Sequence, residues 1–240
     1  MGEIFGRERR RKEGRTILMI LLLGSIITFF LDAQFQFGYG LRSAIKVVLF
    51  IGMPWIMYWQ VKSMDLFSVL RNDLGRSAFR KSVVLGLGVY VFLLVLYVFI
   101  KDFLDLGTIE EALQTGAMVN RDNFLFIALY IPLVNAFLEE FFFRGFGFLK
   151  LRASLGRGPA YLCSALLFSL YHVGIIDGWA NPLITLLALL GLFISGLFFN
   201  FLNEKNGHIY NSYMVHMFAN LAINTIGLQM FGFIHLPFLG

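Results

Sequence analysis

Long apolar runs separated by short polar links recur along almost the whole chain. They lie near residues 16–31, 44–60, 82–100, 123–149, 159–175, 182–202 and 209–226, and a short apolar tail follows at 228–239. Each run approaches or exceeds the roughly 17 to 25 residues that an α-helix needs to cross a bilayer. The pattern predicts an all-α fold, a polytopic transmembrane helical bundle of about seven to eight spans.

Composition supports a membrane protein and argues against other classes. Hydrophobic residues make up 58% of the chain and charged residues only 15%, whereas a soluble domain carries roughly a quarter. The net charge is +5, but Lys and Arg punctuate the apolar runs and do not form one face. We therefore expect the lipid bilayer, and not nucleic acid, as the surrounding partner. The single cysteine, Cys163, is expected to be a small packing residue.

The charged links alternate in sign along the chain. Basic residues crowd the segment from Arg7 to Arg15, the link at 61–81 and the link at 150–158, whereas residues 102–122 are mainly acidic. Cytoplasmic loops are enriched in Lys and Arg. The alternation predicts a multi-pass protein of the cell membrane with a cytoplasmic N-terminus, and we interpret the first apolar run as an uncleaved span.

The chain shows no internal repeat and no linker long enough to separate domains. We expect one membrane domain, residues 1–240, with N-terminal spans and an acidic extracytoplasmic loop at 1–122 and a catalytic helical core at 123–227. The acidic loop is expected to hold a short surface helix. Thr108 and Glu111 have the spacing of a capping box at its start.

Several polar side chains interrupt the apolar runs of the core. Ionised groups at membrane depth cost several kcal/mol each unless they are paired or hydrated, so they indicate a functional site. On a helix, Glu140 and Arg144 share a face and can pair, which leaves Glu139 for chemistry. The other candidates are His172 in the fifth run and His216 and Asn220, one turn apart, in the seventh.

Helix geometry predicts that these groups lie at a common depth. If the fourth and fifth spans form a hairpin that turns at Leu155 and Gly156, Glu139 and His172 lie level with each other. At 1.5 Å per residue, His216 stands about 14 Å beyond Gly207, on a link assigned to the same side of the membrane. The pattern predicts a shared site near the bilayer midplane, in a cavity accessible from the cytoplasm.

The chemistry that this set favours is hydrolysis. A carboxylate beside an imidazole can take a proton from water, and a second imidazole with an amide N–H can stabilise the resulting oxyanion. Phe168, one turn before His172, is expected to be a packing residue. Zinc remains an alternative cofactor, because Glu139, His172 and His216 form a known kind of catalytic ligand set.

Three motifs, EExxxR, FxxxH and HxxxN, follow one another on successive predicted spans. They consist here of Glu139, Glu140 and Arg144, then Phe168 and His172, then His216 and Asn220. Over roughly Phe124 to Ile226 the chain resembles the CAAX protease and bacteriocin-processing (Abi) family of intramembrane proteases; the first 120 residues carry none of the likeness.

The resemblance implies an all-helical fold of roughly eight spans. We favour a metal-free, glutamate-dependent mechanism, because the chain lacks a helical HExxH arrangement and Asn220 suits an oxyanion donor better than a metal ligand. The resemblance assigns activation of the water to Glu139 and His172 and the oxyanion hole to His216 and Asn220, with Glu140 and Arg144 in support. A membrane-associated peptide or lipidated peptide would be the substrate.

Two rival functions stay open. A proton-coupled transporter would use midplane Glu, His and Arg side chains as a relay, although no inverted repeat marks two halves of the chain. A non-catalytic membrane binding protein, such as a bacteriocin-immunity protein, would not need hydrolysis. The intact motif set favours the peptidase.

Overall fold

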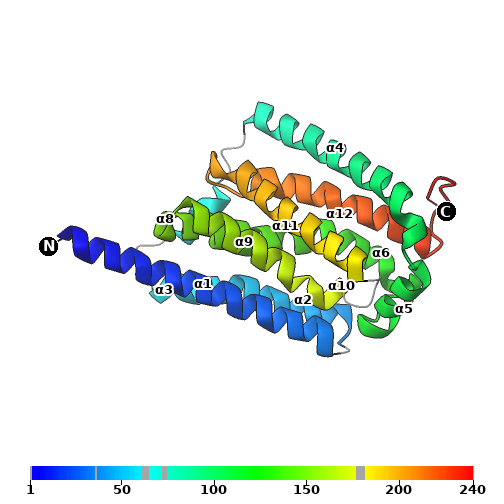
Figure 1. Ribbon diagram of the computed structural model, residues 1–240, viewed down its shortest axis with the longest axis horizontal. Helices are drawn as coiled ribbons and strands as arrows, with labels where there is room; N and C mark the ends of the chain where they lie inside the picture. Colours follow the sequence, from blue (N-terminus) through cyan, green and yellow to red (C-terminus); the bar gives the residue numbers. More distant parts are fainter. Residues whose placement is uncertain (1, 36, 61–64, 72–74, 177–181, 240) are drawn as a thin grey trace.

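The computed structural model describes residues 2–35, 37–60, 65–71, 75–176 and 182–239, and every regular element in these ranges is a helix. This confirms the predicted all-α class (Figure 1). The α-helices are α1 (Gly2–Gln34), α2 (Tyr39–Val47), α3 (Met53–Gln60), α4 (Arg76–Ile100), α5 (Leu106–Gly116), α6 (Arg121–Tyr130), α7 (Ala136–Glu139), α8 (Leu151–Leu155), α9 (Arg157–Tyr171), α10 (Val173–Ile176), α11 (Pro182–Glu204) and α12 (Tyr210–Met230). Short 3₁₀-helices are η2 (Leu66–Leu70) and η3 (Lys101–Phe103), and the π-helical segments are η1 (Val48–Gly52), η4 (Ile131–Asn135) and η5 (Glu140–Lys150).

Among the described residues, six helical stretches are long and apolar enough to cross a membrane. They are Gly6–Gln34, Tyr39–Gln60, Arg76–Phe103, Arg121–Leu155, Arg157–Ile176 and Pro182–Glu204. These stretches correspond to the first six predicted spans. The seventh is α12, a helix of 21 residues that carries several polar side chains and is not among the six. In the described part of the chain, the apolar tail after α12 forms turns and no further span.

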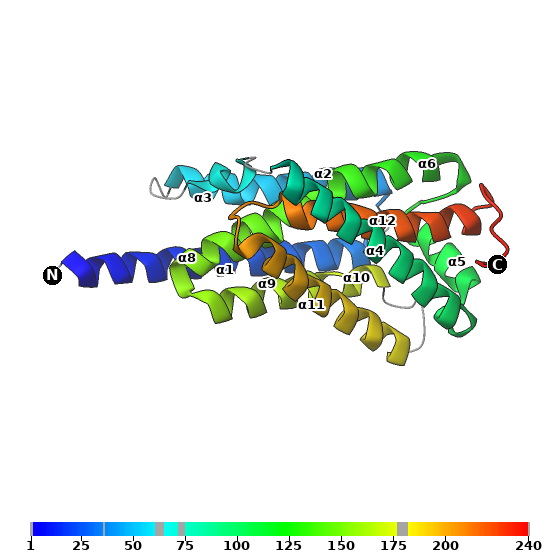
Figure 2. The same cartoon turned by 90° about the horizontal axis from the view of Figure 1, so that it is seen from above.

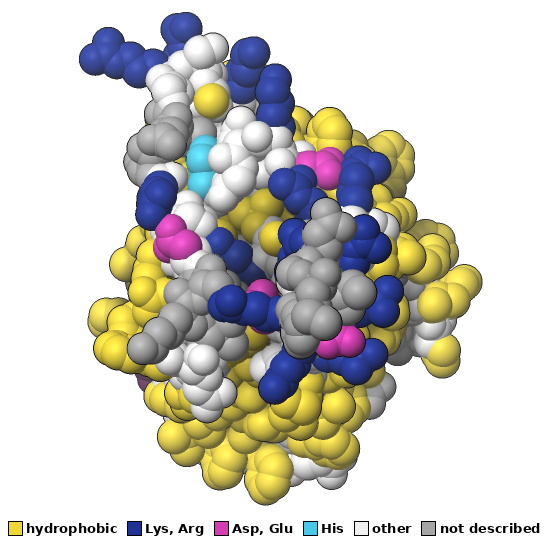
Figure 3. All heavy atoms as spheres, turned by 90° about the vertical axis from the view of Figure 1, so that its left-hand side faces the viewer, with side chains coloured by type: hydrophobic (Ala, Val, Ile, Leu, Met, Phe, Trp, Pro, Cys, Tyr) yellow, Lys and Arg dark blue, Asp and Glu magenta, His cyan; other side chains and the backbone are white. Residues whose placement is uncertain are grey.

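The helices lie along the long axis of the molecule, with the N-terminus at one end and the C-terminus at the other (Figures 1 and 2). Lys and Arg side chains gather on the end where α1 begins, whereas the flanks are hydrophobic (Figure 3). The start of α4 and the turn between α8 and α9 lie at this end (Figure 1). The basic links thus share one end, as the alternation predicts; residues 61–64 and 72–74 of the 61–81 link lie outside the described part.

A cluster of phenylalanines forms the centre of the bundle. Phe142 and Phe143 of η5 are fully buried, and Phe142 stacks on Phe50 of η1 with ring centroids 4.3 Å apart. Phe143 contacts Phe168 of α9 edge to face at 5.5 Å. Such aromatic pairs add about 0.5–1.5 kcal/mol each beyond the area that they bury. The cluster therefore fixes η5, which carries the EExxxR motif, against its neighbours.

The fourth and fifth spans form the predicted hairpin, with a turn of a single residue. Helix α8 continues to Leu155, and α9 begins at Arg157. Gly156 between them has φ +93°, a backbone conformation that glycine adopts without the steric cost met by other residues. The turn at Leu155 and Gly156 is confirmed, and the connection is shorter than the predicted link at 150–158.

The acidic loop contains the expected short helix, α5, but its predicted cap is wrong. The helix begins at Leu106, and the side chain of Asp105 accepts a hydrogen bond of 3.0 Å from the backbone N–H of Thr108. This hydrogen bond lowers the pKa of Asp105 below its usual value. Asp105, two residues after η3, is a stronger N-cap than threonine, so the helix starts earlier than the Thr108 pattern indicates.

Helix α11 packs against α9 at a point where only glycine fits. A Cβ atom on Gly196 would lie 2.9 Å from Cα of Ala165, which is backbone and cannot rotate away. In the same helix, a Cβ atom on Gly191 would meet no atom within 4 Å.

We expect Gly196→Val to separate α9 from α11 and to destabilise the fold by about 1–3 kcal/mol, the usual cost of overpacking. Gly191→Val is the matched control, because it makes the same change at an open position of α11. Thermal unfolding of both variants in detergent micelles measures the difference. Equal melting temperatures would contradict the close contact.

Candidate active site

The EExxxR motif lies where the fourth span leaves regular α-helical geometry. Glu139 ends the short helix α7, and η5 begins at Glu140 as a π-helix of 11 residues. A second π-helical segment, η4, precedes α7. π-Helical turns occur frequently at functional sites. The 3.6-residue pattern on which the predicted depths depend does not indicate these segments.

Glu139 is buried, and one of its oxygens is held by two donors. The amide of Asn135 and the hydroxyl of Tyr171 each donate to Oε1 at 2.5 Å. The other oxygen, Oε2, lies 3.5 Å from Nε2 of His216, which is longer than a direct hydrogen bond. The arrangement orients the carboxylate so that Oε2 faces the second histidine.

Glu140 and Arg144 form the predicted ion pair in the buried core. Nη1 of Arg144 lies 3.5 Å from Oε1 of Glu140, and both side chains are 0% exposed. The guanidinium lies over the ring of Phe168, 3.7 Å from its centroid, and 5.0 Å from that of Phe199. A cation over an aromatic face gains about 2 kcal/mol or more when it is desolvated. Phe168 is thus a packing residue that also stabilises the arginine.

His216 lies between the two carboxylates. Its Nδ1 is 2.9 Å from Oε1 of Glu140, and its Nε2 faces Glu139. The second oxygen of Glu140 accepts a short hydrogen bond from the Ser212 hydroxyl, one turn earlier on α12. Because a carboxylate only accepts, Nδ1 of His216 carries a proton in this arrangement. Glu140 therefore fixes the orientation of the imidazole.

His172 lies within the fifth span, as predicted, at the break between α9 and α10. Helix α9 ends at Tyr171, and the backbone N–H of His172 bonds to Ser169 O and not to Phe168 O. Nδ1 of His172 lies 2.7 Å from the carbonyl oxygen of Phe168. Since a carbonyl accepts, Nδ1 is the donor and Nε2 keeps a lone pair. The ring of His172 lies 4.1 Å from that of Tyr171, whose hydroxyl donates to Glu139.

Asn220 lies one turn beyond His216 on α12 and is partly buried. No hydrogen bond joins its amide to another described residue, Glu139 included. Asn224 has the predicted structural role, because its amide donates to Ala128 O at 2.5 Å.

The candidate zinc ligands are Glu139, His172 and His216. Within the described ranges, no group of three His, Cys, Asp or Glu side chains has an arrangement that would hold a metal ion. The choice between a metal-free and a zinc-dependent site stays a prediction.

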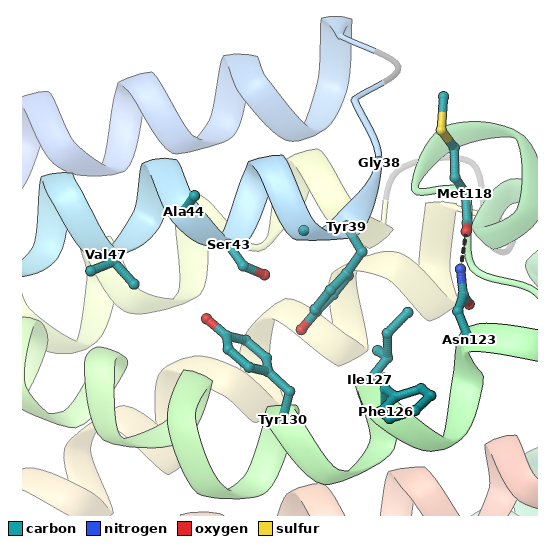
Figure 4. Close-up of a pocket in the computed structure, with 11 residues that line it drawn as sticks. Gly38, Tyr39, Ser43, Ala44, Val47, Met118, Asn123, Phe126, Ile127 and Tyr130 are labelled. Atoms are coloured by element: carbon teal, nitrogen blue, oxygen red, sulfur yellow. Dashed lines mark hydrogen bonds between the residues drawn. The ribbon is translucent and has the colours of Figure 1, made fainter.

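A pocket of about 700 Å³ opens between α2 and α6 (Figure 4). The hydroxyl groups of Tyr39, Ser43 and Tyr130 point into it, and the rest of the lining is mainly apolar (Figure 4). The rings of Tyr39 and Tyr130 meet edge to face, with centroids 5.8 Å apart. The walls of the pocket come from the whole length of α2 and of α6, with Gly38 and Met118 beside them. The predicted access from the cytoplasm stays a prediction.

The structure adds four side chains that the motifs do not contain: Asn135, Tyr171, Ser212 and Lys46. Asn135 and Ser212 each lie four residues before a motif residue, on the same helical face as Glu139 and His216. This spacing could have identified Asn135 and Ser212 from the sequence as neighbours of the motif residues. The contacts of Tyr171 and Lys46 cross between helices, and no periodicity within one span indicates them.

Comparison with protein families agrees with these motifs. Residues 121–222 match a family model described as type II CAAX prenyl endopeptidase, Rce1-like. This part of the chain is Rce1-like. The matched segment contains every residue of the three motifs, and the resemblance to the CAAX protease family is confirmed. No curated protein and no solved structure matches the chain significantly.

Outside this Rce1-like segment lie α1 to α5, which supply Lys46 and one wall of the pocket. The family match supports a multi-pass membrane protein related to proteases that act on membrane-associated substrates.

Removal of Arg144 would leave Glu140 buried without its cation. We expect Arg144→Met to destabilise the protein by about 3–5 kcal/mol, the cost of an uncompensated buried charge. Arg152→Met is the control, because its partner Glu204 and Arg152 itself are 22% and 34% exposed. Unfolding in mixed micelles, followed by circular dichroism, compares the two. A similar small loss in both variants would show that Glu140 does not depend on Arg144.

Proposed function

We propose that the protein is an intramembrane endopeptidase of CAAX-protease type, which hydrolyses a peptide bond in a membrane-associated peptide or protein. One observation carries the proposal. His216 lies 3.5 Å from Glu139, and the ring of His172 lies 4.1 Å from that of Tyr171, whose hydroxyl donates to Glu139, within the segment that matches the Rce1-like family model. We place the N-terminus and the basic end of the bundle on the cytoplasmic side.

Glu139 and His172 activate the water in this mechanism. Oε2 of Glu139, the oxygen that neither Asn135 nor Tyr171 holds, takes one proton from the water. Nε2 of His172 accepts a hydrogen bond from the other hydrogen, because its Nδ1–H is bound to Phe168 O. The resulting hydroxide attacks the carbonyl carbon and forms a tetrahedral intermediate.

His216 and Asn220 stabilise the oxyanion. Since Nδ1–H of His216 donates to Glu140, Nε2 is a donor only in the doubly protonated ring, which lies between two carboxylates. The Asn220 amide adds a neutral donor one turn along α12. Glu139 then gives its proton to the departing amine as the C–N bond breaks.

The pocket between α2 and α6 admits the apolar part of the substrate from the bilayer. Its lining is mainly apolar, and the hydroxyl groups of Tyr39, Ser43 and Tyr130 point into it (Figure 4). A peptide that enters there reaches the site without crossing the basic end.

The decisive variant is Glu139→Gln, which keeps the shape and removes the base. We expect cleavage to fall by at least ~100-fold, the usual contribution of a general base. Glu111→Gln, on the exposed surface of α5, is the control. Purified full-length protein in liposomes is incubated with a mixture of apolar peptides, and products are identified by mass spectrometry. Undiminished cleavage by the Glu139 variant, or none by the parent protein, would refute the peptidase.

Chelation separates the two mechanisms. We expect the purified protein to retain its cleavage activity after exhaustive treatment with a chelator, because the two carboxylates and the imidazoles suffice for acid–base catalysis. The same peptide mixture provides the assay. Loss of activity that zinc restores, and magnesium does not, would establish the zinc-dependent alternative.

A further inference from the structure

One helix of the core lies beside the site without carrying a motif. Helix α11 packs against α9, η5 and α12, the elements that bear most of the motif residues. Near its C-terminal end, Asn203 is 0% exposed. A buried amide is costly unless its polar atoms are hydrogen-bonded. The partners of Asn203 therefore indicate its role.

The amide of Asn203 binds Ser212 of α12 at two points. Its Oδ1 accepts a hydrogen bond from the backbone N–H of Ser212 at 3.2 Å, and its Nδ2 donates to the Ser212 hydroxyl at 2.5 Å. A backbone N–H is only a donor, so the first contact identifies the amide oxygen and leaves the NH2 group for the hydroxyl. Oγ of Ser212 is thus an acceptor towards Asn203.

This contact determines where the hydroxyl hydrogen of Ser212 points. Two acceptors lie within its reach, the carbonyl oxygen of Ile209 at 3.1 Å and, closer, Oε2 of Glu140. A carboxylate is the stronger acceptor. Because Asn203 donates to Oγ and holds the adjacent backbone, the single hydrogen of the hydroxyl is directed to Glu140.

The Ser212 hydroxyl holds the oxygen of Glu140 that the other partners leave free. Nη1 of Arg144 and Nδ1 of His216 both approach Oε1, at 3.5 and 2.9 Å. Among the described residues, Ser212 alone donates a hydrogen bond to Oε2. With both oxygens held, the plane of the carboxylate is fixed. The ring of His216 is fixed with it, so that Nε2 faces Glu139.

The end of α11 is itself held in place. Glu204, the residue after Asn203, accepts hydrogen bonds from Nε of Arg157 at 2.7 Å and from the hydroxyl of Tyr161 at 2.8 Å. Nη1 of Arg152 lies 3.2 Å from the same carboxylate. These contacts join α11 to α8 and α9, so the amide of Asn203 is presented from a fixed backbone.

We propose that Asn203 is a positioning residue of the peptidase, which acts through Ser212 and Glu140 to fix the ring of His216 for stabilising the oxyanion. This inference rests on the proposed peptidase function. Three successive hydrogen bonds carry the effect from α11 to the imidazole. Since the oxyanion exists only after attack on the peptide bond, Asn203 acts on the transition state and not on the binding of the peptide.

A purely structural role for Asn203 is the alternative. Ser212 lies in the first turn of α12, where backbone N–H groups have no partner within the helix, and Asn203 supplies one. Loss of this contact alone would lower stability and leave the ring of His216 in place. Ser212→Ala separates the two roles, because it removes the hydroxyl and keeps the backbone N–H.

The first test compares Asn203→Leu with Asn200→Leu. Asn200 is the matched control, because it lies one turn earlier on α11 and is also 0% exposed. Its amide donates to Tyr161 O at 3.3 Å, and its Oδ1 lies 3.2 Å from Oγ of Ser164. No hydrogen bond between described residues leads from this amide to Glu140.

The peptide that the parent protein cleaves fastest is assayed with full-length protein in liposomes. We expect Asn203→Leu to lower kcat by about tenfold, the effect of losing one hydrogen bond to a charged group, and to leave KM unchanged. Asn200→Leu should retain the parental kcat. Both constants are expressed per monodisperse protein recovered by gel filtration. Asn203→Ala, whose smaller side chain meets no new contact, is measured in parallel.

A double-mutant cycle shows whether Asn203 acts through Ser212. Ser212→Ala should lower kcat by about tenfold, as Asn203→Leu does. The double variant should lose no more than either single variant, because both changes remove the same interaction, whereas independent effects would multiply to about a hundredfold.

A parental kcat in Ser212→Ala or in the Asn203 variants would overturn the proposal, and so would a double variant whose loss is the product of the two single losses. If neither Asn203 variant folds while Asn200→Leu does, Asn203 has the structural role and the proposal is wrong. Failure of the proposed function looks different: the parent protein would cleave no peptide, or Glu139→Gln would cleave at the parental rate.

Discussion

The contact of Glu140 with His216 and Arg144 is the constraint on which the site depends. A carboxylate without exposure to solvent must be compensated by charge and hydrogen bonds. Glu140 obtains both from separate helices, because Arg144 follows it in η5 and His216 and Ser212 lie on α12. The contacts that compensate the charge of Glu140 hold α12 against η5. They also direct the remaining nitrogen of His216 towards Glu139.

Much of this arrangement could be predicted from the sequence, because bilayer length and charge cost are strong constraints. The apolar runs predicted six long helices and α12. The polar interruptions predicted that His216 lies near Glu139. The pair of Glu140 and Arg144 followed from their spacing, and the turn at Gly156 from the short link. These features depend on local periodicity or on a glycine, both of which the sequence displays directly.

The remaining features depend on contacts between helices. The termination of α9 before His172 and the π-helical geometry of η5 have no counterpart in the hydrophobic pattern. Tyr171 resembles any buried aromatic residue until Glu139 is seen beside it. Lys46 lies in a part of the chain without motifs, and only the packing of α2 brings it to the site.

The one-residue turn at Gly156 has a mechanical consequence. A connection of one residue strongly limits the relative movement of the two helical spans that carry Glu139 and His172. These two side chains therefore move together when the hairpin tilts. His216 belongs to a different helix, and its distance from Glu139 depends on how α12 packs against η5. Helices adjust to bilayer thickness by tilting. Lipid chain length would therefore alter the alignment of the oxyanion donors before it disturbs the pair that activates water.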